Sequence, residues 1–235
     1  MKYRHLFFDL DNTLYDFDTN AYHAMFEAFT QLGIISELPS FDAFFKVYSG
    51  INDELWALYR ENKIIKEVLR GLRFERSLGA FGIKPNIPYT SIDDLYLKKM
   101  TQQTALFPET ISILSELKKR GYQLHIITNG FKEVQSDKLR NTGLGMLIKN
   151  VFISEIIKSP KPQREIFEHS IKSSNARKKE SLMIGDSWES DIVGAKNFGI
   201  DQVFFNPSQQ EIDMAELGEP TFTITCLSQL LEILP

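Results

Sequence analysis

The chain has 235 residues, 43% of them hydrophobic and 25% charged, which is the composition of a globular protein with a sizeable core. A net charge of −4 without a basic run argues against a nucleic-acid polymer as partner. The one cysteine, Cys226, excludes a disulfide within the chain and fits a reducing compartment, and we expect it to be a small buried hydrophobe.

The first predicted element is a short apolar run, Leu6–Leu10, which ends in a cluster of Asp, Asn and Thr. This pattern is typical of a buried strand followed by a loop. Because Asp9 and Asp11 interrupt the apolar stretch, it is neither a signal peptide nor a membrane span. We therefore expect a cytoplasmic protein without a membrane partner.

The next part of the chain, from about Phe17 to about Gln103, shows helical periodicity and no convincing strand. Such a block is too long to be a simple connection, so it predicts an all-helical insertion after the first strand. The expected helices are Asn20–Leu32, Phe41–Tyr48, Asn52–Asn62, Lys66–Phe81 and Ile92–Gln103.

After the insertion, apolar runs alternate with helical patterns. The expected strands are Gln123–Thr128, Val151–Ser154, Leu182–Ile184 and Gln202–Phe205, with Phe222–Thr225 as a last strand. The expected helices are Pro108–Arg120, Phe131–Thr142, Gln163–Ser173 and Glu189–Phe198, with Leu227–Leu234 as a last helix. Pro108 should occupy the first turn of its helix, where proline is tolerated.

This alternation predicts βαβ units, and hence an α/β fold with a Rossmann-like parallel sheet and helices on both faces. The expected domains are a core of residues 1–16 and 105–235 and an all-helical insertion of residues 17–104.

Polar residues gather where the predicted core strands end. Ligands of open α/β sheets bind outside the carboxyl ends of the strands, so these residues are the candidates for a site. They are Asp9 and Asp11 after the first strand, Thr128, Asn129 and Gly130 at the second, Lys161 in a loop, and Asp186 and Asp191 after the fourth.

Four carboxylates cannot lie together unpaired, because like charges raise one another's pKa or require a cation. Oxygen ligands without a His or Cys cluster favour a hard ion such as Mg²⁺. The four histidines, His5, His23, His125 and His169, are scattered without zinc spacing, so we expect them to be structural or solvated.

Each of these residues also has an ordinary structural explanation. Loop aspartates cap turns, Asp186 could cap a helix, and Lys161 could be a solvated cation. The functional signal is that all the pieces occur in order, each at a strand end or in a βα loop.

Four motifs in this order resemble those of the haloacid dehalogenase superfamily. They are Phe7-Phe8-Asp9-Leu10-Asp11-Asn12-Thr13-Leu14, Ile127-Thr128-Asn129-Gly130, Lys161-Pro162 and Gly185-Asp186-Ser187 followed by Asp191. The helical insertion is similar to that superfamily's cap of the first type, and the resemblance covers the whole chain.

The resemblance implies a Mg²⁺-dependent phosphatase with an aspartyl-phosphate intermediate. In it, Asp9 is the nucleophile and a metal ligand, and Asp11 binds the metal through its backbone carbonyl while its side chain is the general acid and base. Thr128 and the backbone of Asn129 and Gly130 bind the phosphoryl group, and Lys161 neutralises charge. The resemblance makes Asp186 the remaining metal ligand and gives Asp191 the supporting role of orienting Lys161 or a metal-bound water.

A narrower resemblance is to the subgroup that hydrolyses pyrimidine and noncanonical nucleoside 5′-monophosphates. It is carried by Ile127–Phe131, Val151–Glu155, and in the insertion by Asn52, Leu55, Trp56, Arg73 and Phe74. One departure is Pro160 before Lys161, where the subgroup usually has a small residue. Asn52, Trp56 and Arg73 are candidate substrate contacts, although cap aromatics at helical spacing usually form the cap's own core.

Alternatives remain at the level of the reaction. Dehalogenases of the superfamily lack the second aspartate, so Asp11 favours phosphoryl transfer. A sugar-phosphate phosphatase or phosphomutase would use the same nucleophile, and a non-catalytic regulatory protein could retain the fold. The expected partner is a small phosphate ester, and the sequence gives no oligomeric state.

Overall fold

The computed structural model describes residues 2–212 and 218–235. The chain divides into two compact units, which are here named the core unit, Met1–Phe17 with Thr104–Pro235, and the cap unit, Asp18–Gln103. Among the described residues, no helix is both long and apolar enough to cross a membrane.

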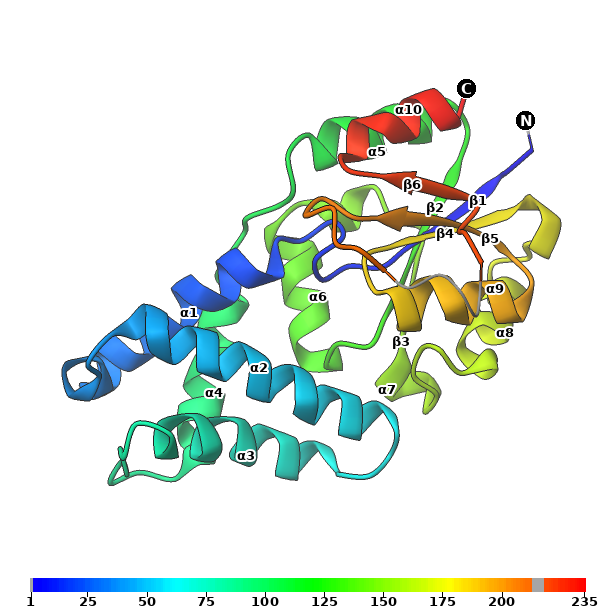
Figure 1. Ribbon diagram of the computed structural model, residues 1–235. Helices are drawn as coiled ribbons and strands as arrows, with labels where there is room; N and C mark the ends of the chain where they lie inside the picture. The colour runs from blue at the N-terminus through cyan, green and yellow to red at the C-terminus, as the bar shows by residue number, and fades with distance from the viewer. Residues whose placement is uncertain (1, 213–217) are drawn as a thin grey trace. The chain divides into compact units, whose positions relative to one another are not determined.

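The core unit contains a parallel sheet in which six strands are described, in the order β3-β2-β1-β4-β5-β6 (Figure 1). The strands are β1 (His5–Phe8), β2 (Gln123–Thr128), β3 (Asn150–Ile153), β4 (Ser181–Gly185), β5 (Asp201–Phe205) and β6 (Phe222–Ile224). The central strands are nearly continuous apolar runs, because a parallel sheet is covered on both faces. The predicted α/β fold is confirmed.

The helices of the core unit are α5 (Thr110–Lys119), α6 (Lys132–Asn141), α7 (Ser154–Ile157), α8 (Arg164–Ser173), α9 (Gly194–Phe198) and α10 (Leu230–Ile233). Helices of this unit connect β2 to β3, β3 to β4 and β4 to β5, whereas α5 precedes β2 and α10 follows β6. Figure 1 shows α5 and α10 on one side of the sheet and α8 and α9 on the other.

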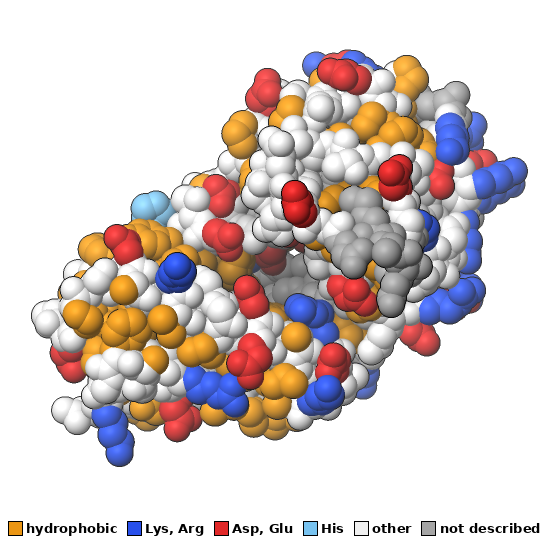
Figure 2. Space-filling view, viewed as in Figure 1, with side chains coloured by type: hydrophobic (Ala, Val, Ile, Leu, Met, Phe, Trp, Pro, Cys, Tyr) orange, Lys and Arg blue, Asp and Glu red, His pale blue; other side chains and the backbone are white. Residues whose placement is uncertain are grey.

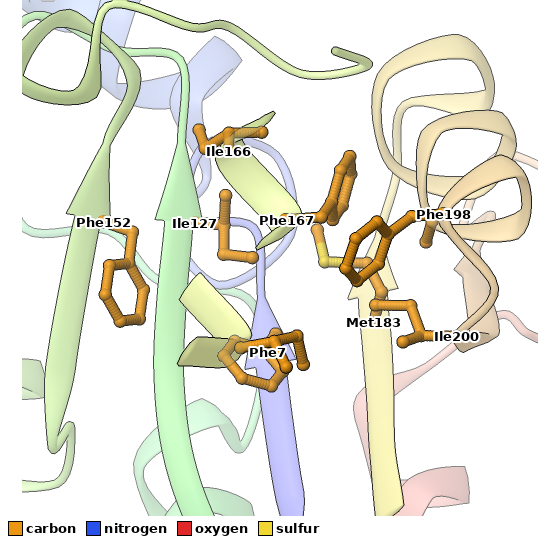
Figure 3. Packing of buried hydrophobic residues seen from close by; sticks show 10 residues of the cluster. Phe7, Ile127, Phe152, Ile166, Phe167, Met183, Phe198 and Ile200 are labelled. Atoms are coloured by element: carbon orange, nitrogen blue, oxygen red, sulfur yellow. The ribbon is translucent and has the colours of Figure 1, made fainter. Parts of the chain in front are cut away.

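One face of the sheet is closed by a cluster of aromatic and aliphatic side chains. Phe167 from α8 and Phe198 from α9 pack over Phe7, Ile127 and Met183 from the three central strands (Figure 3). All five side chains are almost fully excluded from water. Their burial stabilises the sheet by about 2 kcal/mol for each large side chain and fixes the strand ends that carry the site.

The cap unit is all-helical, with α1 (Phe17–Leu32), α2 (Phe41–Arg60), α3 (Lys66–Gly79) and α4 (Tyr89–Met100). Its interior is aromatic: Phe29, Phe44, Tyr48, Phe74 and Tyr96 are all buried and lie within ring-contact distance of one another. The high phenylalanine content of the chain is thus partly explained by this small core.

Four local predictions are wrong. The two helices expected over 41–62 are the single helix α2, because Gly50 costs too little in a helix to break it. Pro108 precedes α5 rather than occupying its first turn, since Glu109 takes a left-handed conformation that delays the helix. The expected helix Glu189–Phe198 begins as a π-helical segment, Trp188–Val193. Cys226 is exposed, because it caps the short 3-10 turn after β6.

Charged side chains of both signs are exposed on the surface (Figure 2). On the face in Figure 2, lysine and arginine side chains are distributed among acidic ones. This agrees with the mildly acidic net charge of the chain.

Candidate active site

The candidate site lies at the carboxyl ends of the three central strands. Asp9 follows β1 directly, Thr128 is the last residue of β2, and Asp186 follows β4 directly. Because β1 pairs in parallel with β2 on one side and β4 on the other, these three ends meet at one edge.

The loop after β1 is a tight turn that returns on itself. The carbonyl of Leu10 accepts hydrogen bonds from the amides of Leu14 and Tyr15, at 3.0 and 2.9 Å. Asn12 takes a left-handed conformation with φ of 60°, which asparagine tolerates better than most residues. Because the chain turns back here, Asp11 stays next to the carboxyl end of β1.

Lys161 is a buried cation of the site, with a side chain only 2% exposed. Its ammonium contacts Oδ1 of Asp9 at 2.5 Å and Oδ1 of Asp191 at 2.6 Å, and donates to the carbonyl of Ile127 at 2.9 Å. Burial alone would lower the pKa of Lys161, but Asp191 and Asp9 raise it above its ordinary value. Lys161 is therefore held in its charged form between two carboxylates.

Asp191 is fully buried and fixed from two sides. Its Oδ2 accepts from the backbone amide of Ser187 at 3.1 Å, while Oδ1 faces Lys161. The carboxylate lies against Gly185, where an added Cβ would come within 2.2 Å of Oδ2. The contact supports the predicted role of Asp191 in orienting Lys161.

Asp9, Asp186 and Asp191 form an acidic cluster in which one oxygen from each lies within 4.8 Å of the others. Burial raises the pKa of Asp9 well above its ordinary value, which Lys161 opposes and Asp191 and Asp186 reinforce. Burial, with Asp191, raises the pKa of Asp186 to about 7. One lysine does not neutralise three carboxylates, so this set of oxygen donors suits a hard divalent cation.

Thr13 holds Asp186 through a reciprocal pair of hydrogen bonds. The Thr13 hydroxyl donates to Oδ1 of Asp186 at 2.8 Å and accepts from the Asp186 backbone amide at 3.1 Å. Thr13 was not among the predicted site residues. Its place two residues after Asp11, in a run of polar residues, was the available signal.

The loop after β2 and the lysine loop are linked by Asn129. Its side-chain Oδ1 accepts from the Lys161 amide at 2.9 Å, and its Nδ2 donates to the Lys161 carbonyl at 3.0 Å. The Thr128 hydroxyl accepts from the Gly130 amide at 3.1 Å, which leaves its own hydrogen available for a ligand. The predicted residues Thr128, Asn129 and Lys161 are therefore brought together.

Two residues of α6 that were not predicted also reach this edge. Gln135 donates through Nε2 to Oδ2 of Asp11 and to the Thr128 hydroxyl, each at 2.8 Å. Lys138 contacts Oδ1 of Asp11 at 2.5 Å. The signal in the sequence was that Gln135 and Lys138 share the helix face of the apolar Val134 and Leu139.

Two of the three predicted cap residues, Asn52 and Arg73, are buried in the cap unit. The Arg73 side chain is 2% exposed and donates through Nε to Oδ1 of Asp93 at 2.7 Å, and its Nη1 lies 3.4 Å from Oδ1 of the buried Asn52. Trp56 is half-buried and stacks edge-on against Tyr59, with ring centroids 5.6 Å apart. The geometry gives Arg73 and Asn52 a structural role in the cap rather than an open binding surface.

Comparisons with known proteins agree with this fold. Residues 3–199 match the model of a family described as haloacid dehalogenase-like hydrolase. The pyrimidine 5′-nucleotidase PynA of Streptococcus pneumoniae is 32% identical over 100% of this chain and 96% of its own length. The pyrimidine 5′-nucleotidase YjjG of Escherichia coli is 28% identical over 100% and 99%. A crystal structure of the putative HAD-hydrolase YfnB of Bacillus subtilis, bound to magnesium, covers 100% of this chain and 99% of its own at 28% identity, with a TM-score of 0.88.

Proposed function

The chain belongs to the haloacid dehalogenase-like hydrolases, and from this membership and its site we propose that it is a Mg²⁺-dependent phosphatase acting on small phosphomonoesters. The observation that carries the proposal is the environment of Asp9. One of its oxygens is paired with Lys161, and within the described residues no hydrogen bond is made by the other. That oxygen can act as a nucleophile.

The residues support a reaction in two steps. In the first, the Asp9 carboxylate attacks phosphorus, the bond from phosphorus to the ester oxygen breaks, and the Asp11 carboxyl gives its proton to the leaving oxygen. In the second, the Asp11 carboxylate takes a proton from water as that water attacks the aspartyl-phosphate. Inorganic phosphate leaves and both aspartates return to their starting forms.

The surrounding groups stabilise charge that develops on the phosphoryl oxygens. The Thr128 hydroxyl hydrogen and the amide of Asn129 are the proposed donors, and Lys161 supplies positive charge next to the nucleophile. When bound, Mg²⁺ would add Lewis-acid stabilisation of the same oxygens. Asp9, Asp186 and the Asp11 carbonyl are the residues that would hold it, with Asp191 orienting Lys161.

For the substrate we propose a nucleoside 5′-monophosphate, with pyrimidine bases preferred. This rests on the two relatives named pyrimidine 5′-nucleotidases and on the subgroup motif Ile127–Phe131. Two alternatives would use the same site. One is hydrolysis of sugar phosphates, and the other is a phosphomutase reaction, in which the phosphoryl group moves between two positions of a sugar.

The experiment is a phosphate-release assay over a panel of nucleoside monophosphates and hexose phosphates, with Mg²⁺ and with chelator. We expect deoxyuridine and thymidine monophosphates to give the highest kcat/KM, and activity to vanish on chelation and return with Mg²⁺. The Asp9→Asn variant should be inactive with every substrate. Faster release from hexose phosphates would reject the nucleotidase proposal, and full activity after chelation would reject the mechanism.

A further inference from the structure

Lys138 is a lysine enclosed in the core unit, with a side chain only 3% exposed. Lysine is almost never buried to this degree without a partner. Its partner is Asp11, and its ammonium also lies 4.6 Å from the ring centroid of Tyr15 and 5.2 Å from that of Phe17. The aromatic rings enclose the ammonium, so its charge is directed at one oxygen of Asp11.

Gln135, nearly one turn earlier on α6, occupies the other oxygen of the same carboxylate. Its Nε2 is shared between Oδ2 of Asp11 and the Thr128 hydroxyl, and the residue is fully buried. An Asp11 oxygen and the Thr128 hydroxyl oxygen both accept from an amide N–H, so Nε2 of Gln135 faces them. One side chain therefore joins the proposed acid–base residue to the proposed phosphoryl-binding residue.

Gly130 leaves room for both of these groups. A Cβ at this position would lie 1.9 Å from Nε2 of Gln135 and 3.2 Å from Oδ2 of Asp11. Only glycine lets the backbone approach the amide and the carboxylate this closely. The Asp11 carboxylate is thus held by Lys138 and Gln135, and the missing side chain of Gly130 leaves space for this contact.

We propose that Lys138 and Gln135 are positioning residues, which hold the Asp11 carboxyl in the orientation needed for proton transfer and couple it to Thr128. The proposal rests on the acid–base role of Asp11 in the proposed function. A general acid must lie within hydrogen-bond reach of the leaving oxygen, and a displacement of about 1 Å can cost about a hundredfold in rate. Donors on both oxygens restrict the carboxylate to one orientation.

The test compares two leaving groups in the first step, measured by rapid mixing before the steady state. A nucleotide releases an alkoxide that needs a proton, whereas p-nitrophenyl phosphate releases a phenolate that leaves without one. In Lys138→Met and Gln135→Leu, we expect the first step to fall by roughly 10- to 100-fold for the nucleotide and by less than about threefold for the aryl ester. Lys132→Met, at an exposed lysine on the same helix, should leave both rates unchanged.

A purely structural role would lower both rates together, and equal losses for the two substrates would overturn the proposal. Lys138→Arg keeps a cation in place. If Lys138→Met is slow because Asp11 is no longer held, Lys138→Arg should have a first-step rate with the nucleotide between those of Lys138→Met and wild type. Thermal unfolding of each variant identifies any loss that comes from misfolded protein.

The same measurement in an Asp11→Asn background separates this inference from the proposed function. If Lys138 acts through Asp11, adding Lys138→Met to Asp11→Asn should cost no further rate. An additional loss as large as that in the single variant would reject the positioning role alone. If Asp11→Asn itself lowers the first-step rate equally for the nucleotide and the aryl ester, Asp11 is not the general acid. This inference then fails together with that part of the proposed function.

Discussion

At the scale of single residues, the site depends on Gly185. This glycine belongs to the fourth sequence motif, but the motif does not show why a glycine is needed there. Gly185 ends β4, and its missing side chain is the space taken by the Asp191 carboxylate. Asp191 is paired with Lys161, and Lys161 is paired with Asp9. We therefore expect a substitution at Gly185 to displace Asp191 and Lys161 and so to change the environment of the proposed nucleophile, Asp9.

We predict that Gly185→Ala lowers kcat by at least about 100-fold and destabilises the protein by about 2–4 kcal/mol. The new methyl group cannot share its position with the buried carboxylate, so Asp191 must move away from Lys161. Steady-state kinetics and urea denaturation measure the two effects.

Gly145→Ala is the matched control, because a Cβ there meets only ordinary contacts, the nearest at 3.5 Å from the Leu139 carbonyl. It should change kcat less than twofold and stability by less than about 1 kcal/mol. Equal effects in the two variants would contradict the steric argument.

The sequence revealed those site residues that lie next to strand ends. Asp9, Thr128 and Asp186 could be found because the carboxyl ends of parallel strands share an edge. Gln135 and Lys138 were missed because they stand mid-helix, where polar residues on an apolar face have no strand end to mark them. Their contacts with Asp11 and Thr128 depend on how α6 packs against the strand ends, which the sequence does not show.

At the scale of elements, a pair of histidines joins neighbouring strands. The two residues are far apart in the sequence, so the pair could not be predicted from their positions. His5 of β1 and His125 of β2 are both buried, and their rings stack with centroids 5.4 Å apart. Nδ1 of His5 lies 3.2 Å from Nε2 of His125, and Asn150 of β3 donates to Nδ1 of His125 at 3.1 Å. The chain of contacts crosses three strands.

This pair predicts acid sensitivity. Burial lowers the pKa of His125 to about 4, with His5 and Lys149 adding to the effect. A histidine in the unfolded chain titrates near 6.5, so between these values the unfolded chain binds the extra proton. The contribution of His125 to the free energy of unfolding should therefore fall by about 1–2 kcal/mol as pH decreases from about 6.5 towards 4.

Urea denaturation at pH 7 and pH 4.5 measures this effect as the difference between wild type and His125→Gln. The variant should lose less stability on acidification, while the exposed His169→Gln should behave as wild type. An identical pH dependence in His125→Gln and wild type would remove His125 as the cause.

In the cap unit, helices α3 and α4 are joined by a buried ion pair. Asp93 is inaccessible to solvent and pairs with Arg73, while Arg70 contacts both Asp93 and the exposed Asp94. Asp93→Asn should destabilise the cap by about 3–5 kcal/mol, because it leaves the Arg73 charge buried without its partner. Asp94→Asn should cost less than about 1 kcal/mol.

Trp56 fluorescence in a Trp188→Phe background reports unfolding of the cap, since the two tryptophans of the chain lie in different units. If Asp93→Asn and Asp94→Asn unfold at the same urea concentration, the buried pair does not stabilise the cap.

Element boundaries were predictable only where periodicity ended at a strong signal. The strands of the core ended close to their predicted positions because turn residues follow them. Helix α2 was divided in error because Ser49 and Gly50 look like a break, whereas burial of Phe44, Tyr48 and Leu55 on one face keeps the helix continuous. The π-helical segment after β4 has no local sequence signature that propensity could detect.

At the scale of the whole molecule, the acidic cluster predicts that a divalent cation stabilises the fold. At about 100 times its dissociation constant, Mg²⁺ should add about 2.7 kcal/mol to the free energy of unfolding. Calorimetry with Mg²⁺ and with chelator measures this, without any dependence on activity. Asp186→Asn should lose the increment, and Glu168→Gln, at an exposed ion pair on α8, should retain it. Equal stabilisation of wild type and Asp186→Asn would place the cation elsewhere.

The strand order has a consequence for how the protein is made. β1 lies at the centre of the sheet, yet both of its partners, β2 and β4, come after the whole cap unit in the chain. On the ribosome, the helices of the cap are complete while β1 still has no strand to pair with, and closing loops of this length is slow. The segment carrying Asp9 must therefore wait in the nascent chain with Leu6, Phe7 and Phe8 exposed. We expect this apolar run to be a binding site for chaperones during synthesis, and to become inaccessible to them once Ser181–Gly185 has left the exit tunnel.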